Sequence, residues 1–216
     1  MKIGLLGKKL GMTRVYDSKG VVTPVTVIEA GGNTLLQKKT TDNDGYVGVK
    51  VGYDTQKEQR LTKPVLGQFK KAGAEPKKLV KEFRLPDNAN LDSVNLSVNQ
   101  FAVGDVVDVI GRSKGHGFQG VVKKHNMSGQ NQTHGSMMHR RNGAIGMRST
   151  PGRIWKNMGM PGHMGDERVT VQNLKVVQVR EEEGVILVSG AIPGKPGSYV
   201  VVRPAKKQKV SKEAGK

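Results

Sequence analysis

Short runs of valine, isoleucine, leucine and threonine recur toward both ends of the chain, with glycine-containing turns between them. Near the amino end, Gly31, Gly32 and residues 42–45 separate three such runs, and three further runs follow residue 167. Short strands of even spacing with glycine-rich turns are typical of β-barrels and β-sandwiches. We expect strands at residues 20–30, 33–40, 45–54, 168–179, 184–192 and 198–204.

Because both ends of the chain contribute strands, one barrel is predicted to close across an insertion. Residues 1–60 and 169–205 are assigned to this barrel, and residues 61–111 to a small α+β insert. Residues 206–216 form a lysine-rich tail that either keeps the protein soluble or contacts phosphate. The expected fold class is mainly β, with a small α+β insert.

The insert is predicted to contain one short helix and two strands. Thr62 is a possible cap, Pro64 lies near the first turn, and Gly73 ends the pattern, as is typical of a helix over residues 61–73. The apolar runs at residues 79–85 and 104–111 indicate strands.

Residues 112–168 have neither the helical nor the strand period. Loops longer than about 12–15 residues are uncommon in compact domains and are usually functional or disordered. One short helix is expected after a tight glycine turn, at residues 118–125. The rest combines glycine, methionine, asparagine and histidine with basic residues, and we expect it to fold only against a partner.

Charge identifies the class of that partner. The formal net charge is +18, yet residues 111–165 hold nine lysines and arginines, all five histidines and no acidic residue. A solvated helix face would mix the two signs. A charge this large repels itself unless something anionic neutralises it, which points to nucleic acid or an anionic membrane.

The candidate contacts are side chains that can donate to phosphate or stack on a base. Trp155 lies between Arg153 and Lys156, so it is either a local apolar anchor beside Ile154 or a stacking platform. The full candidate set is Lys8, Lys9, Arg14, Arg112, Lys114, His116, Lys123, Lys124, His125, His134, His139, Arg140, Arg141, Arg148, Arg153, Trp155, Lys156, His163 and Arg168.

Catalytic, metal and cofactor chemistry is not expected. Cysteine is absent, and the histidine pair at positions 134 and 139 has no carboxylate nearby to complete a metal shell. Residues 115–120 match G-x-G-x-x-G, but the first acid afterwards is Asp166, far beyond the ribose-binding position. No nucleophile elbow or Walker loop occurs, so we expect no enzyme, no metal, no cofactor and no small-molecule substrate.

Membrane partners are not expected either. No apolar run approaches the roughly 18 residues of a membrane span, and glycines interrupt the short apolar run at the amino end, unlike a signal peptide. A cytoplasmic protein is predicted. Two rival classes stay open: a DNA-packaging protein, which would carry its cations on a helix or a β-arm, and an RNA-processing enzyme, which would need a carboxylate or metal constellation.

Seven segments between residues 2 and 204 form a specific combination in this order: KIGLLGKKLGMTRVYD, GVVTPVTVIEA, NDGYVGVKVGY, LTKPVLGQFKKAG, SKGHGFQGVVKKH, IGMRSTPGRIWKNMGMPGHMGDERVTVQNL and GAIPGKPGSYVVVRP. Together they resemble the universal large-subunit ribosomal protein "L three" family, in its bacterial form, and the likeness extends over nearly the whole chain.

The resemblance implies a six-stranded barrel like that of translation factors, from which a long extension enters the large subunit and approaches the peptidyl-transferase centre. It implies binding to large-subunit ribosomal RNA near its 3′ end, contact with neighbouring large-subunit proteins, and a role in early assembly. The extension would be residues 112–168, with its tip at 137–151. Many bacterial members carry a methylated glutamine there; Met147, Arg148 and Ser149 stand in its place, so the resemblance does not carry that modification over.

Overall fold

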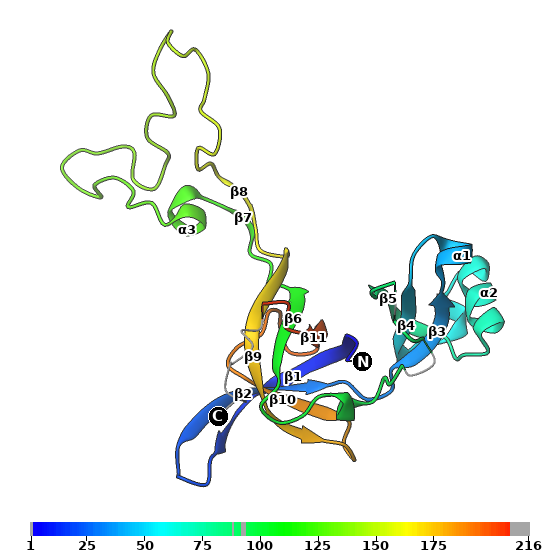
Figure 1. Cartoon of the computed structure of the whole chain (residues 1–216). Coiled ribbons are helices and arrows are strands. Elements are labelled where there is room, and N and C mark those ends of the chain that lie inside the picture. The colour runs from blue at the N-terminus through cyan, green and yellow to red at the C-terminus, as the bar shows by residue number, and fades with distance from the viewer. Residues whose placement is uncertain (1, 88, 92–93, 208–216) are drawn as a thin grey trace, which may run out of the picture. The chain divides into compact units, whose positions relative to one another are not determined.

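The structure is a computed structural model that describes residues 2–87, 89–91 and 94–207. The chain forms two compact units: residues up to Arg112 together with those from Arg168 onward make one, and Ser113–Glu167 make the other. Strands dominate, which confirms the mainly β prediction (Figure 1). No helix in the described part is long and apolar enough to cross a membrane. Of the predicted basic tail, residues 208–216 lie outside the described residues.

Six antiparallel strands of the first unit are hydrogen-bonded in a closed, barrel-like ring, in the order β1-β11-β6-β9-β10-β2. The first strand therefore pairs with the last, and each strand of the ring has a neighbouring strand on both sides, so the ring has no edge strand. The members are β1 (Leu5–Tyr16), β2 (Val22–Glu29), β6 (Val106–Arg112), β9 (Arg168–Arg180), β10 (Val185–Ser189) and β11 (Tyr199–Pro204).

The ring encloses a core of branched aliphatic side chains. Successive side chains of a strand point to opposite faces, so one set per strand faces inward. Leu5, Ile28, Val109 and Ile186 are fully buried in this way, and aromatic residues contribute little. The core therefore rests on valine, isoleucine and leucine, whose branched side chains suit a pleated, buried surface.

A second sheet of three strands lies outside the ring. It consists of β3 (Thr34–Lys39), β4 (Gly48–Thr55) and β5 (Lys77–Arg84), joined by the short helix α1 (Thr41–Asp44), the 3-10 turn η1 (Glu58–Arg60) and α2 (Lys63–Ala72). A further 3-10 turn, η2 (Val98–Gln100), precedes β6.

Three strand assignments from the sequence are wrong. The sequence assigns Thr34–Lys39 and Gly48–Thr55 to the barrel, but they belong to the small sheet; it assigns β6 to the insert, but β6 is a strand of the ring. The reason is physical: alternation determines which face of a strand is buried, and does not determine which strand lies beside it.

The predicted helix of the insert is confirmed as α2. Pro64 lies in its first turn, and Gly73 ends it in the left-handed conformation with φ 61°. Lys70 and Lys71 lie in its last turn, where cations oppose the partial negative charge of the helix end. Phe69 is its buried side chain.

Strand β1 was not predicted because glycines and lysines interrupt its apolar pattern. Two glycines are required by packing: Gly4, directly before the strand, and Gly7 within it. An ideal Cβ on Gly4 would lie 2.3 Å from Cε1 of Phe83, and one on Gly7 would lie 2.7 Å from the carbonyl oxygen of Glu29. The phenyl group of Phe83, a residue of the small sheet, occupies the position that a side chain on Gly4 would take. This contact packs the small sheet against the barrel-like ring.

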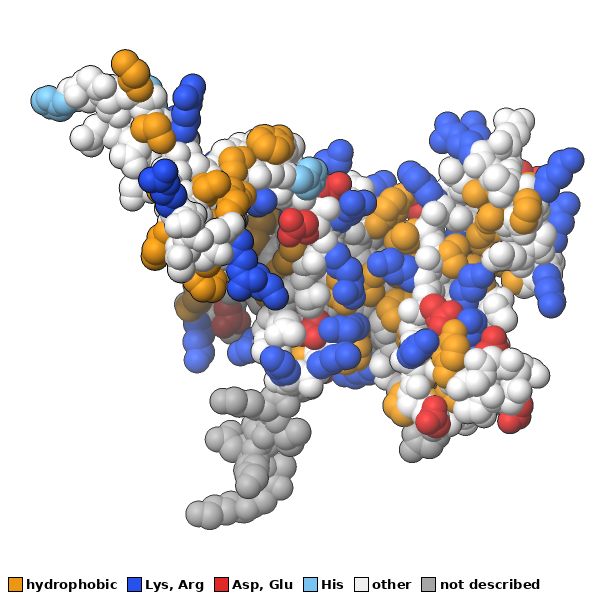
Figure 2. All heavy atoms as spheres, turned by 90° about the horizontal axis from the view of Figure 1, so that it is seen from above, with side chains coloured by type: hydrophobic (Ala, Val, Ile, Leu, Met, Phe, Trp, Pro, Cys, Tyr) orange, Lys and Arg blue, Asp and Glu red, His pale blue; other side chains and the backbone are white. Residues whose placement is uncertain are grey.

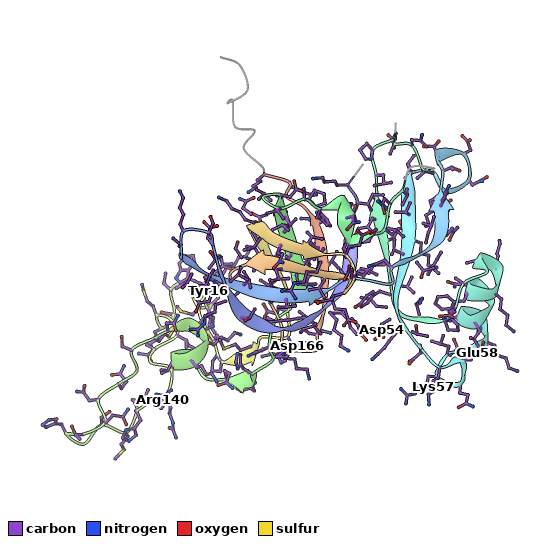
Figure 3. The ribbon with its side chains drawn as sticks, turned by 90° about the horizontal axis from the view of Figure 1, so that it is seen from below. Tyr16, Asp54, Lys57, Glu58, Arg140 and Asp166 are labelled. Atoms are coloured by element: carbon purple, nitrogen blue, oxygen red, sulfur yellow. The ribbon has the colours of Figure 1, made fainter. Side chains whose placement is uncertain are left out.

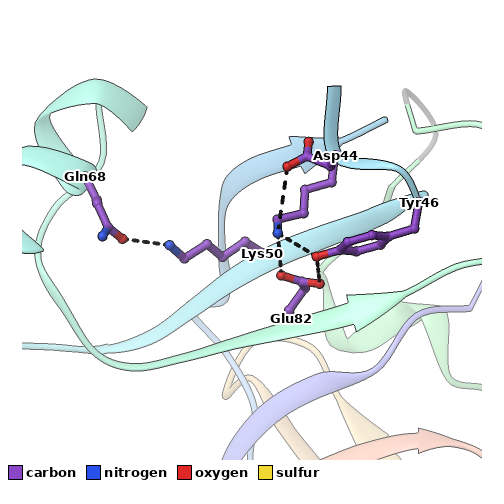
Figure 4. A network of polar contacts seen from close by, with 6 residues as sticks. Asp44, Tyr46, Lys50, Gln68 and Glu82 are labelled. Atoms are coloured by element: carbon purple, nitrogen blue, oxygen red, sulfur yellow. Dashed lines mark hydrogen bonds and ion pairs between the residues drawn. The ribbon is translucent and has the colours of Figure 1, made fainter. Parts of the chain in front are cut away.

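A polar network holds the small sheet together (Figure 4). The Tyr46 hydroxyl donates to Glu82 Oε1 at 2.6 Å, and Lys39 Nζ lies 2.6 Å from that hydroxyl and 2.9 Å from Glu82 Oε2. On the neighbouring strand, Lys50 Nζ donates to Gln68 of α2 at 2.8 Å. The hydrogen bond from Tyr46, followed by that from Lys39, lowers the pKa of the Glu82 carboxyl.

Truncating the ring core should destabilise the protein strongly. Leu5→Ala removes a fully buried side chain, and we expect the free energy of unfolding to fall by about 2–5 kcal/mol. Urea denaturation followed by circular dichroism measures this. The matched control on the same strand is Leu10→Ala, because Leu10 is 47% exposed; its effect should stay within about 0.5 kcal/mol. Equal effects of both substitutions would contradict the inward orientation of Leu5.

Glu82→Gln tests the network through its pH dependence. A carboxyl whose pKa is lowered on folding stabilises the protein above its unfolded pKa of about 4.3, and this contribution disappears as the pH falls through the folded pKa. The variant should be less stable by about 0.5–1 kcal/mol at pH 7, with the difference shrinking toward pH 3 in urea titrations. Glu75→Gln is the control, because that carboxylate is 75% exposed and 3.8 Å from its lysine partner. A deficit that is unchanged at pH 3 would count against the network.

Candidate nucleic-acid interface

The segment Ser113–Glu167 begins and ends in a two-stranded stem. Its ends adjoin Arg112 and Arg168, which are register partners at the ends of β6 and β9. The Ser113 amide donates to the Glu167 carbonyl at 2.9 Å, and β7 (Gly117–Gln119) pairs with β8 (Gly162–Met164). Within the segment, β7 and β8 therefore form an antiparallel stem (Figure 1).

One glycine of the stem has a specific role. Gly165 has φ 74°, and an ideal Cβ there would lie 2.1 Å from the Lys114 carbonyl oxygen. Any other residue would meet both a backbone clash and an unfavourable φ. The close approach of the two chains therefore depends on this glycine.

A short helix, α3 (Val121–His125), follows the stem. The predicted helix over 118–125 is correct from Val121 onward, but Phe118 and Gln119 belong to β7. The strand extends through Phe118 because its partner is His163 of β8, a pairing 45 positions away that local periodicity cannot indicate. Val121 is the one buried side chain of the fully described segment 113–167.

Residues 126–161 form turns and bends without helix or strand. Left-handed residues such as His134, His139 and Asn157 reverse the chain, with φ between 45° and 66°. A few local bonds organise it: the Gln130 amide donates to the His139 carbonyl at 2.7 Å, and His125 Nε2 lies 3.0 Å from the Met160 carbonyl oxygen. The backbone is shaped by turns because no apolar core is present to shape it.

The segment presents its cations outward. It carries eight lysines and arginines against two carboxylates, Asp166 and Glu167, which both lie at the end of the stem. Lys124 is half-buried, and the other seven cations are exposed, as are all five histidines. Figure 3 shows the Arg140 side chain extending away from the ribbon. For the chain as a whole, blue side chains far outnumber red ones on the face in view in Figure 2. The segment is therefore a donor-rich, cationic surface.

Apolar side chains of the segment are exposed too. Trp155 is 55% exposed, its neighbour Ile154 is 45% exposed, and the Arg153 guanidinium lies 5.9 Å from the indole centroid. Met137 and Met147 are 86% and 75% exposed. The exposed indole face is accessible to a base, as the stacking interpretation of Trp155 requires, and the interpretation as a local apolar anchor beside Ile154 stays open.

Three predicted candidates lie on β1, in the other unit. Arg14 is exposed and lies over the Tyr16 ring at 5.9 Å, and Lys8 is half-buried. Lys9 is buried: its ammonium donates to the carbonyls of Ile192 and Gly194 at 2.9 and 3.0 Å. We remove Lys9 from the candidate interface, because a buried ammonium that already has carbonyl acceptors serves the fold.

Some cations that the sequence did not single out also share a site. Lys2, Lys81, Arg203 and Lys206 line a cavity of about 520 Å³ together with the predicted Arg168. Their common location depends on the pairing of distant strands. In the described part of the chain no three His, Asp or Glu side chains are grouped closely enough to hold a metal ion.

Comparison with known proteins places the chain among close relatives. The pattern that defines the family "Ribosomal protein L3" matches residues 50–185. The chain is 56% identical to "Large ribosomal subunit protein uL3" of Akkermansia muciniphila, over 96% of this chain and 100% of the relative. It is 48% identical to the proteins of the same name from Brachyspira pilosicoli (98% and 97%) and Deinococcus radiodurans (97% and 98%).

Hydrogen exchange on the free protein tests the contrast between the two units. Amides of residues 126–161 should exchange far faster than those of β2, β6 and β10, because few of them donate within the segment and almost nothing covers them. Mass spectrometry of peptides after a timed exposure to D₂O measures this. Protection of the segment equal to that of the ring would show a self-sufficient domain and contradict the need for a counter-surface.

Proposed function

The chain belongs to the ribosomal protein L3 family, and from this membership we propose that it is a structural constituent of the large ribosomal subunit that binds the subunit's RNA. The observation that carries the proposal is the segment Ser113–Glu167, which has one buried side chain and an almost acid-free, cationic surface. Such a segment needs a polyanion to supply the contacts that a core would otherwise supply.

We propose a division of labour between the two units. The ring, as a barrel of the translation-factor kind, anchors the protein at the subunit surface, and the extension enters the RNA and approaches the peptidyl-transferase centre with residues 137–151. The chain binds the large-subunit RNA near its 3′ end and contacts neighbouring large-subunit proteins. Binding occurs early in subunit assembly, in the cytoplasm. The family membership supports these proposals.

The mechanism of binding is charge neutralisation followed by local fitting. Each lysine or arginine that meets a phosphate releases condensed counterions, which makes affinity steeply dependent on salt. About nine contacts would give a log–log slope of roughly −6 to −8, at about −0.7 to −0.9 per contact. Histidines, asparagines and the Trp155 ring can then donate to or stack on unpaired bases.

The role is structural and not catalytic. General acid–base chemistry requires a titrating group and an orienting partner within hydrogen-bond reach. The acids of the segment are Asp166 and Glu167; His134 and His139 lie in the turns of residues 126–161, and His163, three positions before Asp166, is exposed. The exposed histidines are better suited to donate to phosphate oxygens.

Neutralising two extension cations should reduce the salt dependence of RNA binding. Arg140 and Arg141 are exposed neighbours, so the double variant Arg140→Gln/Arg141→Gln should lower the slope by about 1.4–1.8 if each contacts one phosphate. Filter binding to large-subunit RNA over a salt series measures it. The control Lys70→Gln/Lys71→Gln changes the same charge on α2 and should leave the slope unaltered.

Two results would overturn the proposal. Equal slopes for both double variants would show that only net charge matters. A preference for duplex DNA over large-subunit RNA at matched salt would indicate a DNA-packaging protein.

A further inference from the structure

A groove lies between the small sheet and the wall of the ring. Its two adjoining parts, of about 520 and 230 Å³, share Lys81, Ile110, Arg168 and Val201 among their lining residues. One side is formed by β5, and the other by the ends of β6, β9 and β11. The groove therefore reaches Arg112 and Arg168, the residues at which the extension leaves and rejoins the ring.

The two sides of the groove are fixed by a shared core. Phe83 of β5 fills the position above Gly4. The rings of Tyr53 on β4 and Tyr199 on β11 meet edge to face with centroids 6.3 Å apart, and the Tyr53 hydroxyl donates to the Glu29 carbonyl at 3.0 Å. The groove is thus a preformed feature, with its shape set by packed side chains.

Positive charge in the groove exceeds what its carboxylates neutralise. Lys2 is paired with Asp105, and Arg203 lies 3.5 Å from Asp108. The one carboxylate among the lining residues, Glu82, is paired with Lys39 at 2.9 Å. Lys81, Arg168 and Lys206 are exposed, and none of the described carboxylates lies within ion-pair distance of these three side chains. These three cations are available to an external anion.

The inner surface of the groove is apolar. Ile3, Ile110 and Val201 are buried to 2%, 6% and 5% exposure, and the half-buried Phe83 lies beside them. An apolar wall concentrates the field of the cations at its rim and strengthens their attraction for an anion. It also offers a surface on which sugars or bases can pack.

We propose that this groove is a second RNA site, which takes the phosphodiester backbone of a single strand of ribosomal RNA and leads it to the root of the extension. The proposal rests on the proposed function. RNA fits better than an acidic protein segment for two reasons. The cations line opposite sides of an apolar channel, as a backbone with bases requires. The channel also ends at Arg112 and Arg168, where the RNA-binding extension begins.

Charge removal tests the groove thermodynamically. In the full chain, Lys81→Gln/Arg168→Gln/Lys206→Gln should lower the salt slope for large-subunit RNA by about 2–3, at about 0.7–0.9 for each contact. The control Lys57→Gln/Lys63→Gln/Lys70→Gln removes the same charge from exposed positions, one directly before η1 and two in α2. Both variants should keep the parental urea midpoint. A slope reduced equally by both variants, or by neither, would overturn the groove.

Site-directed cleavage locates the RNA directly. The chain has no cysteine, so Lys81→Cys, Met137→Cys and Lys70→Cys each create one attachment point for a chelated iron that generates hydroxyl radicals. The expected result is cleavage of large-subunit RNA from positions 81 and 137 and none from position 70.

The other outcomes separate the two proposals. Cleavage from 137 without cleavage from 81 would overturn the groove and leave the proposed function intact, while cleavage from neither would count against the proposed function itself. If, in assembled subunits, position 81 cleaves a neighbouring protein but no RNA, the groove is a protein-docking site and the RNA assignment is wrong. The Lys81→Cys protein must first show the parental urea midpoint, so that loss of cleavage is not a loss of fold.

Discussion

The constraint on which the rest of the structure depends is the repulsion within a cationic segment that has no core. Ser113–Glu167 buries Val121 and little else, so hydrophobic burial cannot oppose the repulsion among its eight lysines and arginines. A counter-surface of opposite charge resolves the conflict. The exposed side chains of Trp155, Met137 and Met147 have no apolar core within the segment to pack into, so they are available to pack against an external partner.

The six-stranded ring holds both ends of this segment. Its six strands close on themselves, and its interior is filled by branched aliphatic side chains. The buried Lys9 of β1 donates to two backbone carbonyls. The segment emerges between two paired residues, Arg112 and Arg168. The segment's own stem, β7 paired with β8, comes directly after this exit point in the chain, and the irregular residues 126–161 follow α3.

Sequence reasoning identified what depends on local pattern and composition. Alternation located most strands, Gly73 located the end of α2, and the absence of acids located the extension. It failed where the answer depends on distant partners. Gly4 and Gly7 disguise β1 because Phe83 and Glu29 occupy the space of their side chains. The neighbours of β3, β4 and β6 and the buried state of Lys9 follow from tertiary packing. The groove joins β5 to the ends of β6, β9 and β11, which no local motif could reveal.

The pairing of β1 with β11 also sets an order of events during synthesis. Leu5–Lys8 find their partners in residues 199–202, near the other end of the chain. β1 can pair with β2 as soon as residues 22–29 are made, but the ring can close only when residues 199–202 are present. The closing step therefore joins segments of very high sequence separation. Until residues 199–202 have been made, the growing chain exposes a strand edge, so the ring can close only after the whole basic extension has been synthesised.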